Sequence, residues 1–289
     1  MSTVSVVTGA NSGIGRATAL RLAAEGHRVY GGMRSLDRGE KLAATAREMG
    51  VEVHPVVIDV SDAASVAAGF AHVLDEAGRV DVLVNNAGIG LNATVEDLDI
   101  EAAQEVMDTN VWGQVRCLQQ VLPGMRERGD GHIVNITSVA GRFAAIGQAG
   151  YTASKWAFEA VSEELAQEVA PFGIKVSIIE PGVTRTAILP KNVGHPTPTA
   201  YEMQYGRMLQ FYAKGIEANV GAEVVADTVV EALNADPHRL RWTCAWGGDE
   251  LTAGRRSLAD EAWVDLGRSH DDEAYYDAFQ DAFGLDLRT

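Results

Sequence analysis

Short apolar runs of strand length alternate with longer helical patterns over the first 180 residues of this chain. The runs are rich in Val and Ile and nearly continuous, which is typical of parallel strands buried on both faces. They lie at 4–9, 27–33, 52–59, 80–86, 131–138 and 174–180. Helical patterns lie between them at about 13–25, 37–49, 62–77, 101–128 and 152–170, with Pro123 placed to kink or split the fourth. This order predicts an α/β fold of the Rossmann type, a doubly wound parallel sheet with helices on both faces.

The chain departs from this order after the sixth run. Residues 187–220 form an insertion with a proline-containing loop and a helix-like stretch. A helix near 222–235 and a seventh strand at 239–246 follow, and the acidic tail 247–289 still carries large apolar residues. Since no repeat or linker interrupts the chain, we expect one domain over residues 1–289, with the extension 247–289 packed on it.

Charge and composition exclude several classes of function. A formal net charge of −16 argues against a nucleic acid or an anionic membrane as the main partner. No apolar run is long enough to cross a bilayer, and the N-terminus lacks the pattern of a signal peptide. Cys117 and Cys244 lie far apart, so we expect free thiols in a reducing cytoplasm. Neither the cysteines nor the histidines show metal-ligand spacing, and we predict no metal site.

A glycine-rich stretch, TGANSGIG at 8–15, follows the first strand and begins the first helix. Glycines at 9, 13 and 15 permit backbone conformations and close approaches that a Cβ would block. The exposed N–H groups and the partial positive charge of the helix start suit a pyrophosphate. An ordinary tight turn is the alternative, but the strand–turn–helix context favours a dinucleotide.

The glycine spacing and five further motifs resemble the short-chain dehydrogenase/reductase family, in its single-domain branch. The motifs are Asp59-Val60, NNAG at 85–88, Asn110, Ser138 with YTASK at 151–155, and PG at 181–182. The resemblance covers residues 3–186 and, more loosely, continues to the seventh strand. It implies a soluble enzyme that interconverts a carbonyl compound and an alcohol with a nicotinamide cofactor.

Four residues match the catalytic positions of the resembling family. Ser138 would polarise the substrate carbonyl, with Thr137 beside it as a second hydroxyl. Tyr151 would exchange the proton, and Lys155, four residues later on the helix, would lower the pKa of the tyrosine and hold the nicotinamide ribose. Asn110 would bend its helix and link the lysine to solvent through water. The alternative for Asn110 is a side chain satisfied by backbone groups at a helix irregularity.

The resemblance also implies a set of cofactor contacts. Asp59 would contact the adenine, although it could instead be an acid near the start of the next helix. Thr186 would hold the nicotinamide carboxamide, with Thr184 as the alternative hydroxyl. Asn85 is expected to brace the strands rather than bind the cofactor. The full predicted set is Gly9, Asn11, Ser12, Gly13, Ile14, Gly15, Arg34, Asp59, Val60, Asn86, Ala87, Gly88, Tyr151, Lys155, Pro181, Gly182, Val183 and Thr186.

The end of the second strand bears on the choice of cofactor. An acidic residue there would bond a free ribose 2′-hydroxyl and repel a 2′-phosphate. This chain has Met33 at that position and Arg34 after it, which favours NADP(H) over NAD(H). Arg34 could instead pair with Asp37 on the surface.

The segment 187–220 is where the resembling family varies its substrate lid. Its side chains favour a bulky lipophilic ketone or alcohol of steroid, polyketide or terpenoid type. The alternative is that they cover the core or a neighbouring subunit. The apolar and aromatic side chains are Ile188, Leu189, Tyr201, Met203, Tyr205, Met208, Leu209 and Tyr212.

We therefore predict a cytoplasmic NADP(H)-dependent carbonyl reductase or alcohol dehydrogenase. The resemblance implies a homodimer or homotetramer joined through the helices at 101–128 and 152–170. Two alternatives are an NAD-dependent alcohol dehydrogenase and a dinucleotide-binding sensor without chemistry. The presence of Asn110, Ser138, Tyr151 and Lys155 argues against the sensor.

Overall fold

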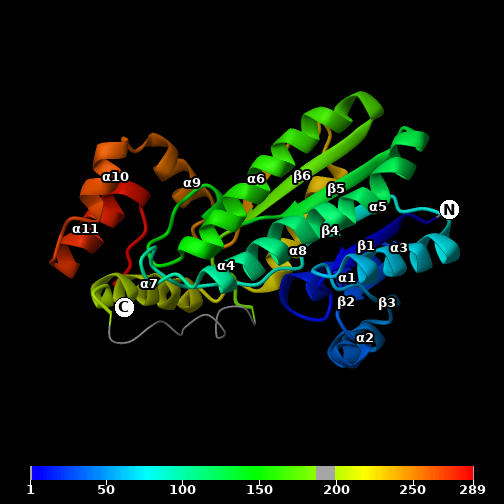
Figure 1. Ribbon diagram of the computed structural model, residues 1–289, viewed down its shortest axis with the longest axis horizontal. Helices are drawn as coiled ribbons and strands as arrows, with labels where there is room; N and C mark the ends of the chain where they lie inside the picture. The colour runs from blue at the N-terminus through cyan, green and yellow to red at the C-terminus, as the bar shows by residue number, and fades with distance from the viewer. Residues whose placement is uncertain (1, 187–198, 289) are drawn as a thin grey trace.

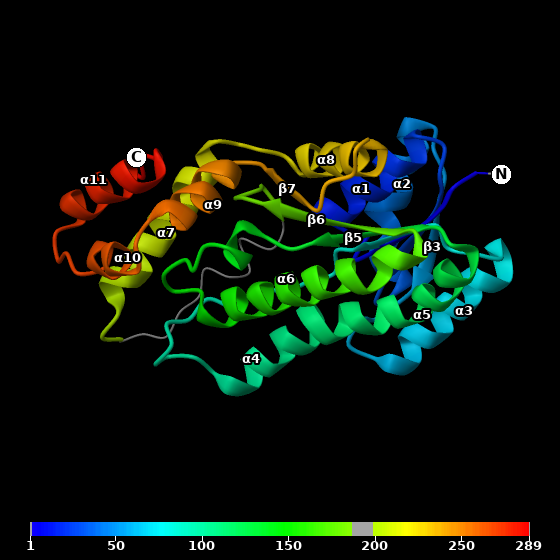
Figure 2. The ribbon, with the colours of Figure 1, turned by 90° about the horizontal axis from the view of Figure 1, so that it is seen from above.

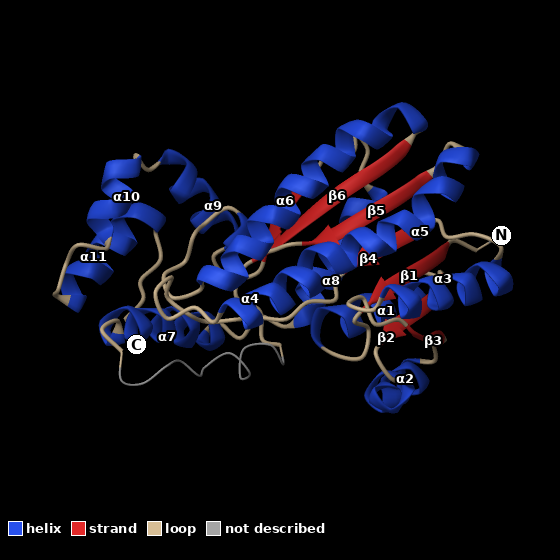
Figure 3. Ribbon diagram, viewed as in Figure 1, coloured by secondary structure: helices blue, strands red, loops and turns tan. Residues whose placement is uncertain are grey.

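A single parallel sheet of seven strands forms the centre of the protein (Figures 1 and 3). The computed structural model describes residues 2–186 and 199–288. The strand order is β3-β2-β1-β4-β5-β6-β7, and every neighbouring pair is parallel. The bounds are β1 Val4–Thr8, β2 Arg28–Met33, β3 Val53–Val57, β4 Val82–Asn85, β5 Gly131–Ile136, β6 Ile174–Pro181 and β7 Arg241–Cys244. The predicted seven-stranded doubly wound sheet is confirmed.

Helices cover both faces of the sheet, as Figure 2 shows from above. On one face lie α3, α5 and α6, whose apolar side chains form one core cluster with β1, β4 and β5. On the other lie α1, α2 and α8, which form a second cluster. The bounds are α1 Gly13–Ala24, α2 Glu40–Met49, α3 Ala63–Ala77, α4 Ile100–Met107, α5 Gly113–Arg128, α6 Ala149–Val169 and α8 Ala222–Asn234.

The burial of each strand depends on whether it lies at the centre or at the edge of the sheet. All residues of the central strands β1, β4 and β5 are buried, because helices cover both of their faces. The edge strand β3 is partly exposed and contains Pro55, which an edge tolerates because a missing N–H costs no interior ladder bond.

The expected helix at 101–128 is interrupted, but not at Pro123. Helix α5 continues through Pro123 from Gly113 to Arg128, so the predicted split there was wrong. The interruption lies at η2, the π-helical turn Asp108–Trp112 between α4 and α5. Such turns are often found at functional sites, and this one contains Asn110.

Within the described residues, four helices extend the protein beyond the carboxyl ends of the strands (Figures 1 and 2). They are α7 Glu202–Glu217, α9 Gly248–Ser257, α10 Asp260–Leu266 and α11 Asp272–Phe283. The last three belong to the tail 247–289, and together with α7 they form a third cluster that we call the C-terminal cluster. Its buried members are Val139, Phe143, Val183, Phe211, Leu251, Tyr275, Phe279, Phe283 and Leu287.

Arg207 joins α7 to α11 and to the segment that precedes α11. Its side chain is fully buried, and Nε lies 2.8 Å from Asp272 Oδ1. One terminal nitrogen donates to the Ser269 carbonyl at 2.8 Å, and the guanidinium lies 4.2 Å from the ring centre of Tyr275. A buried cation with this many partners holds its neighbours in one arrangement.

We predict that Arg207→Ala lowers the free energy of unfolding by about 2–4 kcal/mol, since it removes two charge-assisted hydrogen bonds, a ring contact and buried volume. The matched control is Arg268→Ala, whose side chain is 77% exposed and pairs with Asp265 at 2.8 Å. This exposed pair is worth at most about 0.5 kcal/mol. Urea unfolding of both variants measures the difference, and equal losses would contradict the role given to Arg207.

Candidate active site

A cleft of about 730 Å³ opens at the carboxyl ends of the strands. This is where an open parallel sheet binds ligands, because the strand order reverses between β1 and β4. Of the residues predicted to act in catalysis or to bind the cofactor, all of which the structure describes, only Gly15 and Asn110 do not line it. The others in its wall are Gly9, Asn11, Ser12, Gly13, Ile14, Arg34, Asp59, Val60, Asn86, Ala87, Gly88, Ser138, Tyr151, Lys155, Pro181, Gly182, Val183 and Thr186.

The glycine-rich turn needs its glycines for different reasons. Gly9 and Gly13 have positive φ angles of 67° and 52°, which other residues rarely adopt. A Cβ on Gly15 would lie 2.4 Å from the Gly9 carbonyl oxygen and from Asn86 Nδ2. Gly15 therefore lets α1 approach the turn. Ser12 makes no side-chain capping bond to α1, so the first N–H groups of this helix stay available to an anion.

Thr8 fixes the neighbouring NNAG turn, a role that the sequence reasoning missed. Its Oγ1 accepts hydrogen bonds from the backbone N–H groups of Asn86 at 2.9 Å and Ala87 at 3.0 Å. Asn86 Nδ2 in turn donates to the Thr8 carbonyl at 2.8 Å. The available signal was a hydroxyl at the last position of an otherwise buried apolar strand. Asn85 braces the sheet as expected, donating to Asn135 Oδ1 at 3.1 Å.

Asn110 lies behind the cleft wall in η2 and is 1% exposed. Its Oδ1 accepts from the Ile89 N–H at 2.9 Å, while Nδ2 donates to the Ile89 carbonyl at 2.9 Å and to Ser154 Oγ at 3.0 Å. Ser154 then donates to the Tyr151 carbonyl at 2.7 Å. Within the described residues, no hydrogen bond joins Asn110 to Lys155. The contacts tie the Ile89 loop to α6, so the expected relay through Asn110 stays a prediction.

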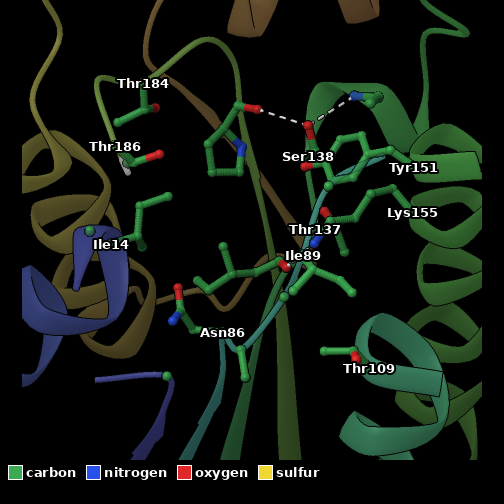
Figure 4. A pocket seen from close by; sticks show the side chains of 18 of the residues that line it. Ile14, Asn86, Ile89, Thr109, Thr137, Ser138, Tyr151, Lys155, Thr184 and Thr186 are labelled. Carbon is green, nitrogen blue, oxygen red and sulfur yellow. Dashed lines mark hydrogen bonds between the residues drawn. The ribbon is translucent and has the colours of Figure 1, made fainter. Parts of the chain in front are cut away.

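Ser138, Tyr151 and Lys155 face one part of the cleft (Figure 4). Ser138 precedes the 3₁₀ turn η3, Val139–Gly141, where its Oγ accepts from the Ala140 N–H at 3.1 Å and donates to the Pro181 carbonyl at 3.4 Å. Lys155 Nζ lies 5.7 Å from the ring centre of Tyr151 and donates to the Ile136 carbonyl at 3.1 Å. The neighbouring Thr137 instead donates to the Ile179 carbonyl at 3.0 Å.

Burial governs the charge of this pair. It raises the pKa of the Tyr151 phenol, and a hydrogen bond with Ser138 offsets part of that effect. Burial also lowers the pKa of Lys155 to about 8, while the carboxylate of Glu159 opposes the change. The expectation that Lys155 lowers the pKa of Tyr151 was therefore wrong for this arrangement. Desolvation is the largest cause of the shift in the pKa of Tyr151, and the charge of Lys155 is not among its causes.

A buried charge cluster lies behind the catalytic pair and was not predicted. Burial, and then the charge of Glu180, raises the pKa of Glu159 to about 7. Arg241 Nε lies 3.3 Å from Glu159 and 3.2 Å from Glu180, and Arg142 lies 3.2 Å from Glu180. These charges join α6, β6 and β7 to the segment that carries Ser138. Their partners come from distant parts of the chain, so spacing gave no signal.

Two arginines line the opposite end of the cleft. Arg34 and Arg38 are both exposed, and Met33 beside them is buried. Among the described residues Asp37 forms no ion pair with Arg34 and instead accepts from Ser35 at 3.4 Å. The sequence analysis did not single out Arg38. The available signal was a second basic residue four positions after Arg34.

Asp59 lies at this end too. Its Oδ1 accepts from the N–H of Ser61 at 3.1 Å and from the Ser61 hydroxyl at 2.7 Å. The cap of α3 is Asp62, whose carboxylate accepts from the N–H groups of Ala64 and Ser65. The alternative role considered for Asp59, an acid at the start of the next helix, is thus filled by Asp62.

The loop after β6 approaches the glycine-rich turn. A Cβ on Gly182 would lie 1.9 Å from the Trp246 carbonyl oxygen, so no larger residue fits there. Thr184 donates to the Gly182 carbonyl at 3.2 Å, whereas Thr186 packs against Gly13. Both threonines line the cleft, on the wall that faces Tyr151 in Figure 4.

The aromatic stripe predicted within the lid mostly contacts protein. The Tyr205 hydroxyl accepts from the Thr94 N–H at 3.0 Å, and Met208 packs against Gly147. Of the stripe, Tyr212 lines the cleft, and it is joined there by its neighbour Phe211. Ile188 and Leu189 lie outside the described residues.

Three further observations bear on the sequence predictions. Cys117 and Cys244 are free thiols, and burial raises their pKa values to about 12 and about 11. The parts of the chain that the structure describes contain no group of three or more His, Cys, Asp or Glu side chains able to hold a metal ion. Over the same residues, none of the helices combines the length and apolar character that crossing a membrane requires.

Comparison with known proteins yields a consistent result. The family model described as short chain dehydrogenase matches residues 3–195. The 17-beta-hydroxysteroid dehydrogenase type 1 of Homo sapiens is 37% identical over 253 residues, which are 83% of this chain and 76% of that protein.

Two solved structures extend the comparison to the fold. The actinorhodin polyketide ketoreductase with NADPH has a TM-score of 0.71 and 32% identity, covering 83% of this chain and 95% of the other. A short chain dehydrogenase/reductase from Burkholderia phymatum in complex with NAD has a TM-score of 0.77 and 29% identity, covering 94% and 97%. Together with the family match and the cleft, these likenesses identify the chain as a member of the short-chain dehydrogenase/reductase family of oxidoreductases, which act on alcohols and ketones.

Proposed function

We propose that the protein is an NADP(H)-dependent oxidoreductase that interconverts a bulky lipophilic ketone or aldehyde and its alcohol. The observation that carries this proposal is the position of Ser138, Tyr151 and Lys155 in the same cleft as the glycine-rich turn. A phenol, a hydroxyl and an ammonium group can together polarise and protonate a carbonyl oxygen.

The residues present fit a dinucleotide. Gly9 and Gly13 adopt the positive φ angles of a phosphate-binding turn, and a side chain on Gly15 would collide with the Gly9 carbonyl and the Asn86 side chain. The uncapped start of α1 offers N–H donors to the pyrophosphate. When bound, the nicotinamide supplies or accepts the hydride, which no side chain can do.

The side chains polarise the substrate carbonyl and supply the proton for the reduction. Ser138 donates a hydrogen bond to the carbonyl oxygen, and Tyr151 donates the proton that converts the developing alkoxide to an alcohol. Burial keeps the pKa of Tyr151 raised, so the phenol is protonated at neutral pH, as reduction requires. The Lys155 ammonium group stabilises the phenolate left behind.

Arg34 and Arg38 support NADP(H) as the cofactor. Both line the cleft where the adenosine ribose of a bound dinucleotide would lie, and guanidinium groups bond phosphate strongly. One related structure contains NADPH and another NAD, so kinship alone does not choose between them. In the NAD-dependent alternative the cofactor carries no 2′-phosphate, and Arg34 and Arg38 would be exposed side chains without a role in cofactor choice.

The substrate end of the cleft supports a lipophilic carbonyl compound. Apolar and aromatic side chains form its wall: Val139, Phe143, Ala145, Val183, Phe211 and Tyr212. Relatives named for steroid and polyketide substrates agree with a ring-containing molecule of this kind.

The oligomeric state and the cytoplasmic location stay predictions. The half-exposed Trp112 and Trp156, at 51% and 49% exposure, lie on the two predicted subunit-joining regions. They support a homodimer or homotetramer, which the mass in solution decides.

We predict that Tyr151→Phe lowers turnover by about 10²–10⁴-fold, because it removes the proton donor. Turnover is followed by nicotinamide absorbance with a panel of ketones and alcohols, while fluorescence titration measures NADPH affinity, which should stay within about twofold. The matched control is Tyr30→Phe. The Tyr30 hydroxyl donates a hydrogen bond to Glu76 at 3.0 Å, and neither residue lines the cleft. Undiminished turnover in Tyr151→Phe would refute the mechanism, and no turnover by the unmodified protein would favour the sensor.

We predict that Arg34→Glu weakens NADPH binding by about 10- to 100-fold, because a charge-assisted bond becomes a repulsion. NADH binding should change less than about threefold. Arg47→Glu makes the same charge change on an exposed position of α2 outside the cleft wall and should affect neither. If NADPH and NADH weaken equally, the NAD-dependent alternative replaces the proposal.

A further inference from the structure

Two phenylalanines, Phe143 and Phe211, belong to the apolar wall of the substrate end. Phe143 follows η3, close in sequence to Ser138, and Phe211 lies on α7 beside Tyr212. Both line the cleft, yet they are only 3% and 8% exposed. The two rings are nearly parallel, with an angle of 22° and centres 6.3 Å apart. Each ring therefore offers the cleft only a small part of its surface, while protein covers the rest.

The cover comes from the last two helices. Phe143 contacts Phe283 edge-on at 5.2 Å, Trp263 at 5.4 Å and Phe279 at 6.3 Å between ring centres. Phe211 contacts the same Phe279 at 6.3 Å. Phe279 is 2% exposed and does not line the cleft, so it touches both wall residues from behind.

Hydrogen bonds fix α11 and the segments on either side of it to α7. Arg207 on α7 binds Asp272 and the Ser269 carbonyl, and Gln210 on α7 donates to the Leu287 carbonyl at 2.6 Å. A Cβ on Gly254 of α9 would lie 2.4 Å from the Phe283 ring, which shows how closely α9 and α11 pack. The tail thus has one tightly held position relative to the wall.

We infer that α10 and α11 set the substrate selectivity of the cleft, with Phe279 as the positioning residue that holds Phe143 and Phe211 against a rigid, fused-ring ketone. This inference rests on the proposed function and deepens it. A rigid aromatic wall favours a rigid ring system, because many of its atoms meet the wall at once and little conformational freedom is lost on binding. A small acyclic ketone needs only Ser138 and Tyr151 and makes little use of the wall.

The inference predicts a difference between two probes, 1-decalone and 2-butanone, each assayed with NADPH. The unmodified protein should have a KM for 1-decalone at least about tenfold below that for 2-butanone. Phe279→Ala should raise the KM for 1-decalone about tenfold with little change in kcat, and leave the KM for 2-butanone and the affinity for NADPH within about twofold. Phe279→Leu, which retains much of the volume, should lie between the two.

A matched control separates selectivity from general destabilisation. Phe70→Leu removes the same side-chain volume as Phe279→Leu, also from a fully buried ring. Phe70 lies on α3, in the core cluster on the sheet face opposite to α1, α2 and α8. It should leave the ratio of the two KM values unchanged, with thermal melting recorded for every variant. An unchanged ratio in Phe279→Leu, or equal losses on both ketones, would overturn the inference. A lack of turnover by the unmodified protein on both ketones would instead overturn the proposed function.

Discussion

Parallel pairing of the strands is the constraint on which the rest of the structure depends. Because all seven strands run in one direction, their carboxyl ends meet at one edge of the sheet. The reversal of strand order between β1 and β4 opens that edge into a cleft. The glycine-rich turn after β1 and Ser138 after β5 thereby face each other, although 130 residues separate Thr8 from Ser138.

Burial at this edge gives the catalytic pair its chemical character. The same packing that fixes Tyr151 and Lys155 buries Lys155 and partly buries Tyr151, so the neutral form of each is favoured. The buried carboxylate of Glu159, one turn after Lys155, partly restores the ammonium form. Arg142 and Arg241 hold the Glu159–Glu180 cluster together, and thus support the pair from behind.

The sequence predicted most of the frame, because strand burial and turn chemistry are local. Each of the seven strands lies within its expected range except for Pro181, one residue past the sixth. Interactions between distant segments were not predicted. The π-helical turn around Asn110, the contacts of Thr8 with the NNAG turn and the buried Arg207 all need partners that spacing along the chain does not reveal. The pKa of Tyr151 was predicted in the wrong direction, since burial cannot be read from a four-residue spacing.

The pH dependence of carbonyl reduction tests the central claim, that a partly buried Tyr151 acts with a charged Lys155. Reduction needs a protonated phenol and an ammonium group. The pKa of Lys155 is lowered to about 8, whereas the pKa of Tyr151 is raised above its ordinary value, so the phenol still carries its proton at the pH where Lys155 loses its charge. We predict that kcat for ketone reduction is constant below about pH 7 and falls as the pH rises through about 8. A kcat that stays constant up to about pH 10 would show that the charge of Lys155 is not required and would contradict the account.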